Sequence, residues 1–488
     1  MGLLSPSDNN KPATAANDDR ARTSGVEPIS EVLAVNSATN LYPSDGDTDM
    51  QLSGETPPES AMGEEEDDDI GSVKTAGAIR ENTNIWKSAF HIFKANVGTG
   101  VFLLPTFYKD AGYVMGAILG AAIGACVVDA SRLLLHTKLR INRPRVDTYS
   151  RICGYVLGRP MQWALFLALI LTQFGFCLMY VQLTAGTMNE MVSFTGSEFI
   201  WMLAVFVIVY PLTCFSDNLS LLALASILAA VAVTFALVAT LARSGVVIHT
   251  NHGISPFTNL VGTNLPIGWF NNLANNMMVL EGIAIVLPVH SACNQKQHFL
   301  LMLCLVLAIV VAFYLLYGLV GYLAYGSTIT TSLVSSMPED TLSIVIRVTF
   351  IINLVCTYPV QFQSAIQLID QLASTRSRSW KGLLIRLVIN AIITGLAMGI
   401  GSSTVDIVVS FIGALPATVM VLILPALLNL QLEYAVENPD EDRGTLAYWK
   451  KIFTQRPVCS WLRFRCYLYI VLGVLIMGIG TYSIAITL

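Results

Sequence analysis

Long runs of apolar residues separated by short polar connections make up most of the chain after residue 84. Eleven of these runs approach the roughly 20 residues that an α-helix needs to cross about 30 Å of hydrocarbon. Helices rather than strands are indicated, because strands of a membrane barrel would alternate apolar and polar residues in segments of about ten. The pattern predicts an all-α membrane protein with eleven transmembrane helices, at 87–108, 112–136, 161–189, 199–215, 219–242, 266–289, 298–325, 342–370, 383–401, 405–430 and 465–487.

Composition excludes a soluble globular protein. The chain of 488 residues is 54% hydrophobic and 12% charged, with a mean hydropathy of +0.61. Lys and Arg are distributed unequally between alternate connections: fifteen fall after the predicted second, fourth, sixth, eighth and tenth helices, whereas the other connections contain Arg243 alone. Because cytosolic loops of membrane proteins are enriched in Lys and Arg, the first set of connections is predicted to face the cytosol.

Residues 1–84 differ in composition from the rest of the chain. They contain 5 basic and 17 acidic side chains, a net charge of −12, and include the acidic run from Glu64 to Asp69. Their apolar content is too low to offset the entropy lost on ordering. No basic stretch followed by an apolar run opens the chain as in a signal peptide. We therefore expect a disordered acidic cytosolic tail at 1–84 and a transmembrane domain at 85–488.

The first predicted helix contains the run Asn96-Val97-Gly98-Thr99-Gly100, with Pro105 five residues later. Each glycine costs about 1 kcal/mol of helix stability relative to Ala, and proline removes a hydrogen bond. Unwinding here would free backbone N–H groups at the N-terminus of a half-helix, where a carboxylate can bind. A kinked but continuous helix that packs through its glycines is the alternative.

The sixth predicted helix is also polar and breakable. Four asparagines precede Glu281-Gly282, and Pro288 follows; the asparagines are Asn271, Asn272, Asn275 and Asn276. Interrupted helices at corresponding positions of two five-helix halves are typical of inverted-repeat transporters, whose binding site lies near the membrane midplane between them. The eleventh helix would lie outside the repeat.

These segments carry a resemblance to a known family. His91–Gly112 resembles the first helix of the proton-coupled amino-acid transporters in the amino acid/auxin permease superfamily, and Glu281–Pro288, Thr357–Phe362 and Ser410–Leu428 resemble parts of later helices. Yeast vacuolar amino-acid exporters of this superfamily are similar over the same stretches. The resemblance implies a five-plus-five inverted repeat with the bacterial leucine transporter-like fold, and an amino acid bound between helices 1 and 6 that gains access to each side alternately.

The expected binding site combines both interruptions. The substrate carboxylate is predicted to lie on the amides around Gly98, Thr99 and Gly100, and the ammonium on carbonyls of the helix 6 interruption. The resemblance places helix 8 against this site, although a packing role for its Tyr358 is equally consistent. Relatives often have an aromatic residue where this chain has Leu280, so their side-chain specificity is not carried over. The predicted substrate-binding residues are Asn96, Val97, Gly98, Thr99, Gly100, Glu281, Gly282 and Tyr358.

His91 is a candidate for proton coupling. An imidazole with an ordinary pKa near 6.5 can take up and release a proton in the physiological range. The resemblance gives a histidine at this place a role in proton coupling. A passive histidine near the cytosolic end of helix 1 is the alternative.

Glu281 is the second candidate, because an ionisable group inside a membrane helix costs about 3 kcal/mol or more and indicates function by default. It could take a proton, attract the substrate amino group, or form an ion pair with Lys94 or Lys109. Asp129, three residues before Arg132 in helix 2, is predicted to form a local ion pair with it near the cytosolic surface.

The sequence thus predicts a proton-coupled secondary transporter that moves small neutral amino acids by alternating access in a plasma membrane or a vacuole- or lysosome-type membrane. A sodium-coupled carrier, and a channel or non-transporting amino-acid sensor of the same fold, remain as alternatives. No catalytic triad, phosphate-binding loop or metalloprotease motif occurs, so an enzyme is not expected. We expect no cofactor and no metal site, since His249 and His252 lack Cys, Asp or Glu beside them. Amino acid, a proton or sodium ion, and membrane lipid are the expected partners, and nucleic acid is not.

Overall fold

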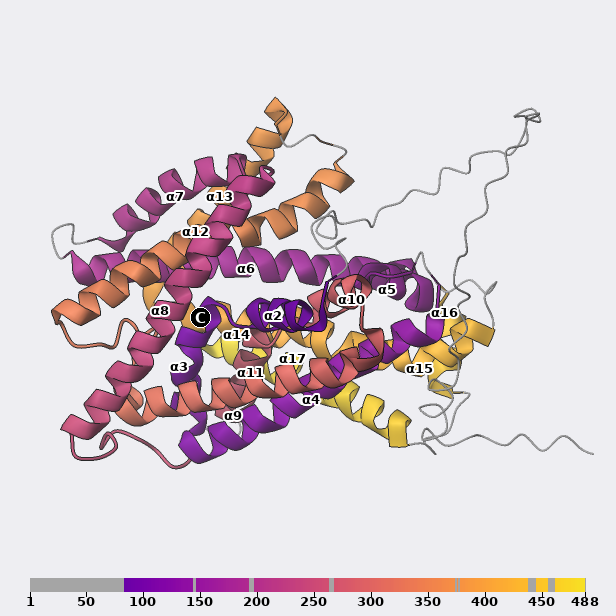
Figure 1. Cartoon of the computed structure of the whole chain (residues 1–488), viewed down its shortest axis with the longest axis horizontal. Helices are drawn as coiled ribbons and strands as arrows, with labels where there is room; N and C mark the ends of the chain where they lie inside the picture. The colour runs from indigo at the N-terminus through magenta and orange to yellow at the C-terminus, as the bar shows by residue number, and fades with distance from the viewer. Residues whose placement is uncertain are drawn as a thin grey trace, which may run out of the picture. The chain divides into compact units, whose positions relative to one another are not determined.

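A computed structural model describes residues 83–143, 146–192, 197–262, 267–373, 375, 378–437, 445–454 and 461–487. All but the last two residues of the predicted acidic tail lie outside these ranges. The described chain is almost entirely helical (Figure 1). Its helices are α2 Ile85–Asn96, η2 Thr99–Leu103, α3 Leu104–Ala111, α4 Tyr113–Ile141, α5 Tyr149–Leu157, α6 Arg159–Met191, α7 Glu198–Cys214, α8 Leu219–Thr250, α9 Ile267–Val279, α10 Ile283–Ala292, α11 Lys296–Tyr325, η3 Gly326–Thr328, α12 Thr341–Leu372, α13 Trp380–Ile400, η4 Ser402–Thr404, α14 Val405–Ile412, η5 Gly413–Ala417, η6 Val419–Ile423, α15 Leu424–Glu437, α16 Leu446–Thr454 and α17 Trp461–Thr487.

Within the described residues, nine helices are long and apolar enough to cross a membrane. Three of these nine consist of consecutive pieces: α9 with α10, α11 with η3, and α14 through α15. The remaining two of the eleven predicted spans are present as shorter elements: the interrupted series α2, η2 and α3, and the 17-residue helix α7. The chain is therefore an integral membrane protein with multiple spans.

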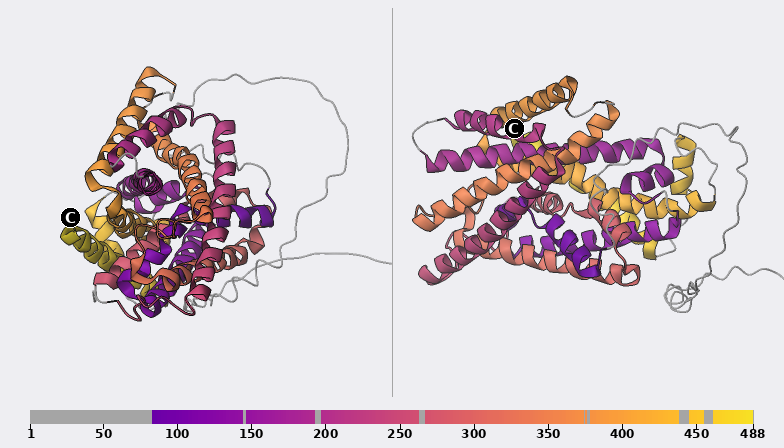
Figure 2. Two further views of the ribbon diagram at one scale, coloured as in Figure 1. Left: turned by 90° about the vertical axis from the view of Figure 1, so that its left-hand side faces the viewer. Right: turned by 45° about the horizontal axis from the view of Figure 1, so that its top comes forward.

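Helix α8 illustrates why these sequences form membrane helices. Its run of apolar residues exposes large side chains such as Leu224, Ile227 and Val231, which are 54%, 59% and 66% exposed. Lipid solvates such a surface, and the helix satisfies its own backbone hydrogen bonds. α8 packs across α12, as Figures 1 and 2 show from different directions. One side of α8 faces lipid and the other packs against α12, so neither side requires charged residues.

Two glycines permit close approaches that position the interrupted helices. Gly112, between α3 and α4, has φ of 77°, and a Cβ there would lie 2.7 Å from the Leu260 carbonyl oxygen. Gly413 begins η5, and a Cβ there would lie 1.8 Å from the carbonyl oxygen of Ala274 in α9. The η5 and η6 segments are π-helical, a wide-turn form that the sequence pattern did not predict.

A buried ion cluster joins α12, α13 and the turn between α7 and α8. Arg386 of α13 is fully buried, and its Nη2 atom lies 2.9 Å from Asp370 Oδ2 and 3.5 Å from Asp217 Oδ1. Gln363 of α12 donates a hydrogen bond of 2.9 Å to the same Asp217 oxygen. Charges and hydrogen bonds therefore link three segments that are far apart in the sequence.

The predicted pair between Asp129 and Arg132 is wrong. Asp129 instead binds Arg465 of α17. The Nη1 atom of Arg465 lies 2.8 Å from Oδ1 and 2.9 Å from Oδ2 of Asp129. Tyr469, one turn further along α17, donates a third hydrogen bond of 2.8 Å. A guanidinium contact to both carboxylate oxygens is stronger than a contact along one helix, and sequence spacing cannot reveal a partner more than 300 residues away.

Candidate functional site

The structure contains the predicted interruption of helix 1. α2 ends at Asn96, Val97 and Gly98 have extended backbone, and η2 begins at Thr99. The 3₁₀ turns of η2 then continue directly into α3. The alternative of a continuous kinked helix is therefore excluded, and amide groups at Gly98, Thr99 and Gly100 lie at the start of a new helical segment.

Helix 6 is interrupted as well. α9 ends at Val279 and α10 begins at Ile283, so Leu280, Glu281 and Gly282 connect the two halves. The Leu280 amide still bonds the Asn276 carbonyl at 3.2 Å, and Gly282 starts the second half. The four asparagines of α9 are largely buried. Asn272 donates a hydrogen bond of 2.9 Å to the Phe107 carbonyl of α3.

The two interruptions touch each other. A Cβ at Gly282 would lie 2.5 Å from Asn96 Oδ1, so only glycine leaves room for this side chain. Asn96 is held in place by two hydrogen bonds. Its Nδ2 atom donates one of 2.9 Å to the Ile92 carbonyl, and its backbone carbonyl accepts one from the Tyr314 hydroxyl of α11. The contact therefore depends on a rigid amide on one side and a missing side chain on the other.

Unused polar groups and open space lie at the helix 1 interruption. Among the described residues other than its chain neighbours, no atom lies within 4 Å of the position that a Cβ would take at Gly98. The Thr99 hydroxyl is buried and makes no well-directed hydrogen bond within the described part of the chain, although Tyr180 of α6 lies beside it. Such groups fit a ligand with an oxygen that accepts hydrogen bonds.

Glu281 has no cationic partner among the described residues. Its Oε2 atom is buried and forms no hydrogen bond there. The structure does not contain the ion pairs of Glu281 with Lys94 or Lys109 that were considered from the sequence. Lys94 donates a hydrogen bond of 3.0 Å to the Ser226 hydroxyl, and Lys109 donates one of 2.7 Å to the Ile329 carbonyl. Tyr180 is close enough to Glu281 to interact with it electrostatically. The carboxyl group is therefore available to a proton or to a ligand.

Two predicted residues are not gathered at the interruptions. His91 is exposed on α2, as are Trp86 and Phe90, which are 80% and 63% exposed. Tyr358 is buried, and its hydroxyl donates a hydrogen bond of 2.8 Å to Asn390 Oδ1 of α13. The Tyr358 hydroxyl is thus directed to α13 rather than to the helix 1 interruption.

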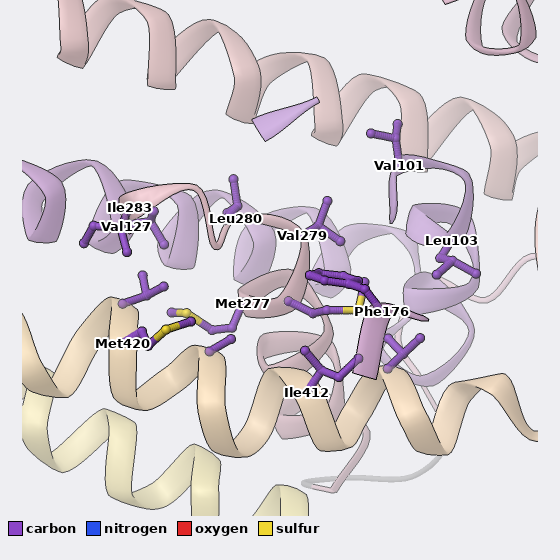
Figure 3. Close-up of a cluster of buried hydrophobic side chains, with 14 of the residues drawn as sticks. Val101, Leu103, Val127, Phe176, Met277, Val279, Leu280, Ile283, Ile412 and Met420 are labelled. Carbon is purple, nitrogen blue, oxygen red and sulfur yellow. The ribbon is translucent and has the colours of Figure 1, made fainter. Parts of the chain in front are cut away.

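Several residues around the interruptions were not anticipated from the sequence. Tyr180 lies beside both Thr99 and Gln361 of α12. Apolar side chains fill the adjoining space, and Figure 3 shows Phe176 of α6 between the helix 6 residues Met277 and Val279 and Ile412 of α14. The sequence of α6 is predominantly apolar, and its pattern did not single out these positions.

Comparisons with known proteins agree with this architecture. The sequence profile of the family described as "Transmembrane amino acid transporter protein" matches residues 81–486. Vacuolar amino acid transporter 3 of Schizosaccharomyces pombe is 24% identical over 367 residues, which cover 71% of this chain and 53% of that protein. The aligned part of this chain therefore spans only about half the length of that relative. Amino acid transporter AVT3A of Arabidopsis thaliana is 26% identical over 357 residues, covering 71% of this chain and 81% of that protein.

Among solved structures, the inward-facing conformation of Mhp1 is similar with a TM-score of 0.52 and 11% sequence identity, covering 83% of this chain and 92% of that one. At this identity the similarity concerns the fold alone. The family match spans both interruptions and all of the described helices apart from the last residue of α17. The chain belongs to the family of transmembrane amino acid transporter proteins.

Proposed function

We propose that this chain is a secondary transporter that binds an α-amino acid between the helix 1 and helix 6 interruptions. The observation that carries the proposal is the contact between the interruptions at Asn96 and Gly282, beside open space at Gly98. Family membership and the names of the relatives, which are amino acid transporters, support the same substrate class.

The substrate carboxylate binds the amides of Gly98, Thr99 and Gly100 and the Thr99 hydroxyl. These groups begin a continuous helical stretch from η2 into α3, so the partial positive charge of a helix N-terminus adds to the hydrogen bonds. The ammonium group lies on the opposite side, toward the carbonyls of Leu280 to Gly282 and the Glu281 carboxyl group. Opposite partial charges on the two interruptions thereby orient a zwitterion.

The surroundings favour a small neutral side chain on the substrate. A Cβ at Gly100 would already lie 3.4 Å from Met278 Cε and 3.5 Å from Val279 Cγ2, so space on that side is limited. The nearby side chains Phe176 and Ile412 are apolar. A buried charged or strongly polar side chain would find few partners there.

Glu281 is the group that we assign to proton binding within the site, and His91 is assigned to proton exchange at the exposed surface of α2. Protonation of Glu281 removes a buried charge that has no cationic partner among the described residues, and so favours the state in which the site is sealed from water. Coupling then follows, since substrate and proton stabilise the same sealed state.

We further propose eleven spans in a five-plus-five inverted repeat, with the N-terminal tail and the Lys- and Arg-rich connections on the cytosolic side of a vacuole-type membrane. The Schizosaccharomyces pombe relative, which is named a vacuolar amino acid transporter, supports this location. The charge asymmetry supports the orientation.

Uptake of radiolabelled amino acids into proteoliposomes tests the proposal. We expect small neutral amino acids to move, and an imposed pH gradient but not a sodium gradient to accelerate them. His91→Ala and Glu281→Gln are expected to lose this acceleration while retaining exchange of internal for external amino acid. Acceleration by sodium alone would replace the proton with sodium as the coupling ion, and absence of movement under every gradient would refute transport.

A further inference from the structure

A groove lies between α4 and α11 and is formed by small side chains. Its volume is about 430 Å³, within the roughly 300–1,000 Å³ range of small-molecule pockets. A Cβ at Gly124 would lie 2.5 Å from the Val311 side chain, so the two helices pack closely there and run side by side (Figure 1). Exposed alanines beside this approach, Ala121, Ala125, Ala308 and Ala312, leave the space unfilled.

The groove faces the hydrocarbon rather than water. The neighbouring α11 residues Leu301, Leu305 and Ile309 are large, apolar and 55–63% exposed, as lipid-facing side chains are. An apolar void without contents would lose the dispersion contacts of its lining atoms, and water gains no hydrogen bonds from alanine walls. A lipid acyl chain is the apolar matter available at this surface.

A cation without an acidic partner lies at one end of the groove. Arg132 lines the groove, is exposed, and forms no ion pair within the described residues. Asp129 also lines it, but the Arg465 and Tyr469 contacts already satisfy that carboxylate. Arg132 lies four residues, or about 6 Å of helix rise, before the predicted end of the apolar run at residue 136. Its guanidinium can therefore reach the level of lipid headgroups.

We propose that this groove binds an anionic glycerophospholipid, whose acyl chain lies along the alanines and whose phosphate accepts hydrogen bonds from Arg132. Basic pockets between membrane helices on the cytosolic side suit such headgroups. In the orientation predicted from the charge count, the lipid belongs to the cytosolic leaflet.

The site is connected to both interruptions. On α4, a Cβ at Gly120 would lie 3.6 Å from Asn276 of α9. On α11, Tyr314 donates its hydroxyl proton to the Asn96 carbonyl. A bound lipid that holds α4 against α11 therefore stabilises the packing around the interruptions, and we infer that anionic lipid raises the transport rate.

Lipid retention by the purified full-length protein tests the site without relying on transport. The protein is equilibrated with mixed micelles of phosphatidylcholine and phosphatidylglycerol of matched chain length, and retained lipid is counted by native mass spectrometry. Arg132→Gln is compared with Lys381→Gln, which removes an exposed cation of α13 outside the groove. Ala308→Phe and Ala312→Leu fill the groove, and Ala223→Phe enlarges an exposed alanine of α8 as their control.

We expect Arg132→Gln to lower the ratio of retained phosphatidylglycerol to phosphatidylcholine about fivefold, which corresponds to about 1 kcal/mol for one basic residue at an anionic headgroup. The two groove-filling variants should lose one lipid of either kind, and both control variants should match the parent. An unchanged ratio in Arg132→Gln would overturn the headgroup assignment, and full retention in both groove-filling variants would overturn the groove. Failure of transport in every lipid would refute the proposed function while leaving these binding results unaffected.

Discussion

At the scale of single residues, Gly282 is the position where the smallest change should matter most. In Gly282→Ala the new Cβ would meet Asn96 Oδ1 at 2.5 Å, and the amide cannot move freely because Ile92 and Tyr314 bind the same residue. Overpacking of this kind costs about 1–3 kcal/mol. We expect amino-acid uptake to be lost while the protein still inserts and purifies.

Gly399→Ala is the matched control for that experiment. Gly399 lies in α13, and outside its own helix no atom of the described residues lies within 4 Å of the position that a Cβ would take. Replacing glycine by alanine in a helix stabilises it by up to about 1 kcal/mol. Uptake by this variant should equal that of the parent. Normal uptake by Gly282→Ala would show that the interruptions need not touch.

Much of the site could be predicted at this scale, because irregular backbone leaves marks in the sequence. Glycines and a proline marked the run Asn96 to Gly100, and Glu281-Gly282 combined a charge with a glycine inside an apolar run. Tyr180 left no such mark. Its place beside Thr99 depends on how α6 rotates against helix 1, which tertiary packing determines.

At the scale of the elements, buried charges decide how helices are joined. Removing the guanidinium in Arg386→Gln would leave Asp370 and Asp217 facing each other without their shared cation. Breaking a buried ion pair in this way costs about 3–5 kcal/mol. We expect a large fall in the thermal unfolding midpoint in detergent, which Asp370→Asn in the same chain should partly restore.

Lys381→Gln, which changes an exposed cation five residues earlier on α13, is the control and should leave that midpoint unchanged. Equal midpoints for Arg386→Gln and the parent would mean that the cluster does not join α12 and α13. The sequence did not predict this cluster, since its members are separated by up to 169 residues.

The start of α12 gives a prediction for pH. Asp340 accepts a 2.8 Å hydrogen bond from the Ser343 amide and lies 2.5 Å from Arg243 of α8. Hydrogen bonding to Ser343 is the main cause that holds the pKa of Asp340 below its ordinary value, and the positive charge of Arg243 adds to it. A carboxyl group with a lowered pKa in the folded state stabilises it above about pH 4, and this contribution is lost as pH falls through the folded pKa. Asp340→Asn should therefore lower the unfolding midpoint at pH 7, and the difference from the parent should shrink in acid. A difference that persists unchanged in acid would contradict this role of the charge.

At the scale of the whole molecule, the order of elements followed from apolar run lengths, whereas their packing did not. Hydrophobicity marks where lipid is the solvent, so the positions of α4, α6, α8, α11, α12, α13 and α17 were close to the predicted ranges. Which helices pack against each other depends on how the side chains of both contacting helix surfaces fit together. The contact of α17 with α4 through Asp129 and Arg465 is an example, because the sequence offered a nearer partner in Arg132.

The orientation in the membrane is the last expectation that can be tested directly. The charge count places the start of α11 at the cytosolic face and the connection after α8 on the other side. His298→Cys, in the first turn of α11, and His252→Cys, in that connection, should therefore differ in accessibility. Both histidines are exposed, and their replacement alters no buried contact. In sealed vesicles of known sidedness, a membrane-impermeant maleimide added to the cytosolic face should label His298→Cys above the parent background and spare His252→Cys until the vesicles are opened. The opposite order would invert the proposed topology and move the anionic-lipid groove to the other leaflet. Labelling of both variants from one face would mean that the single proposed span between them, α9 with α10, does not cross the membrane.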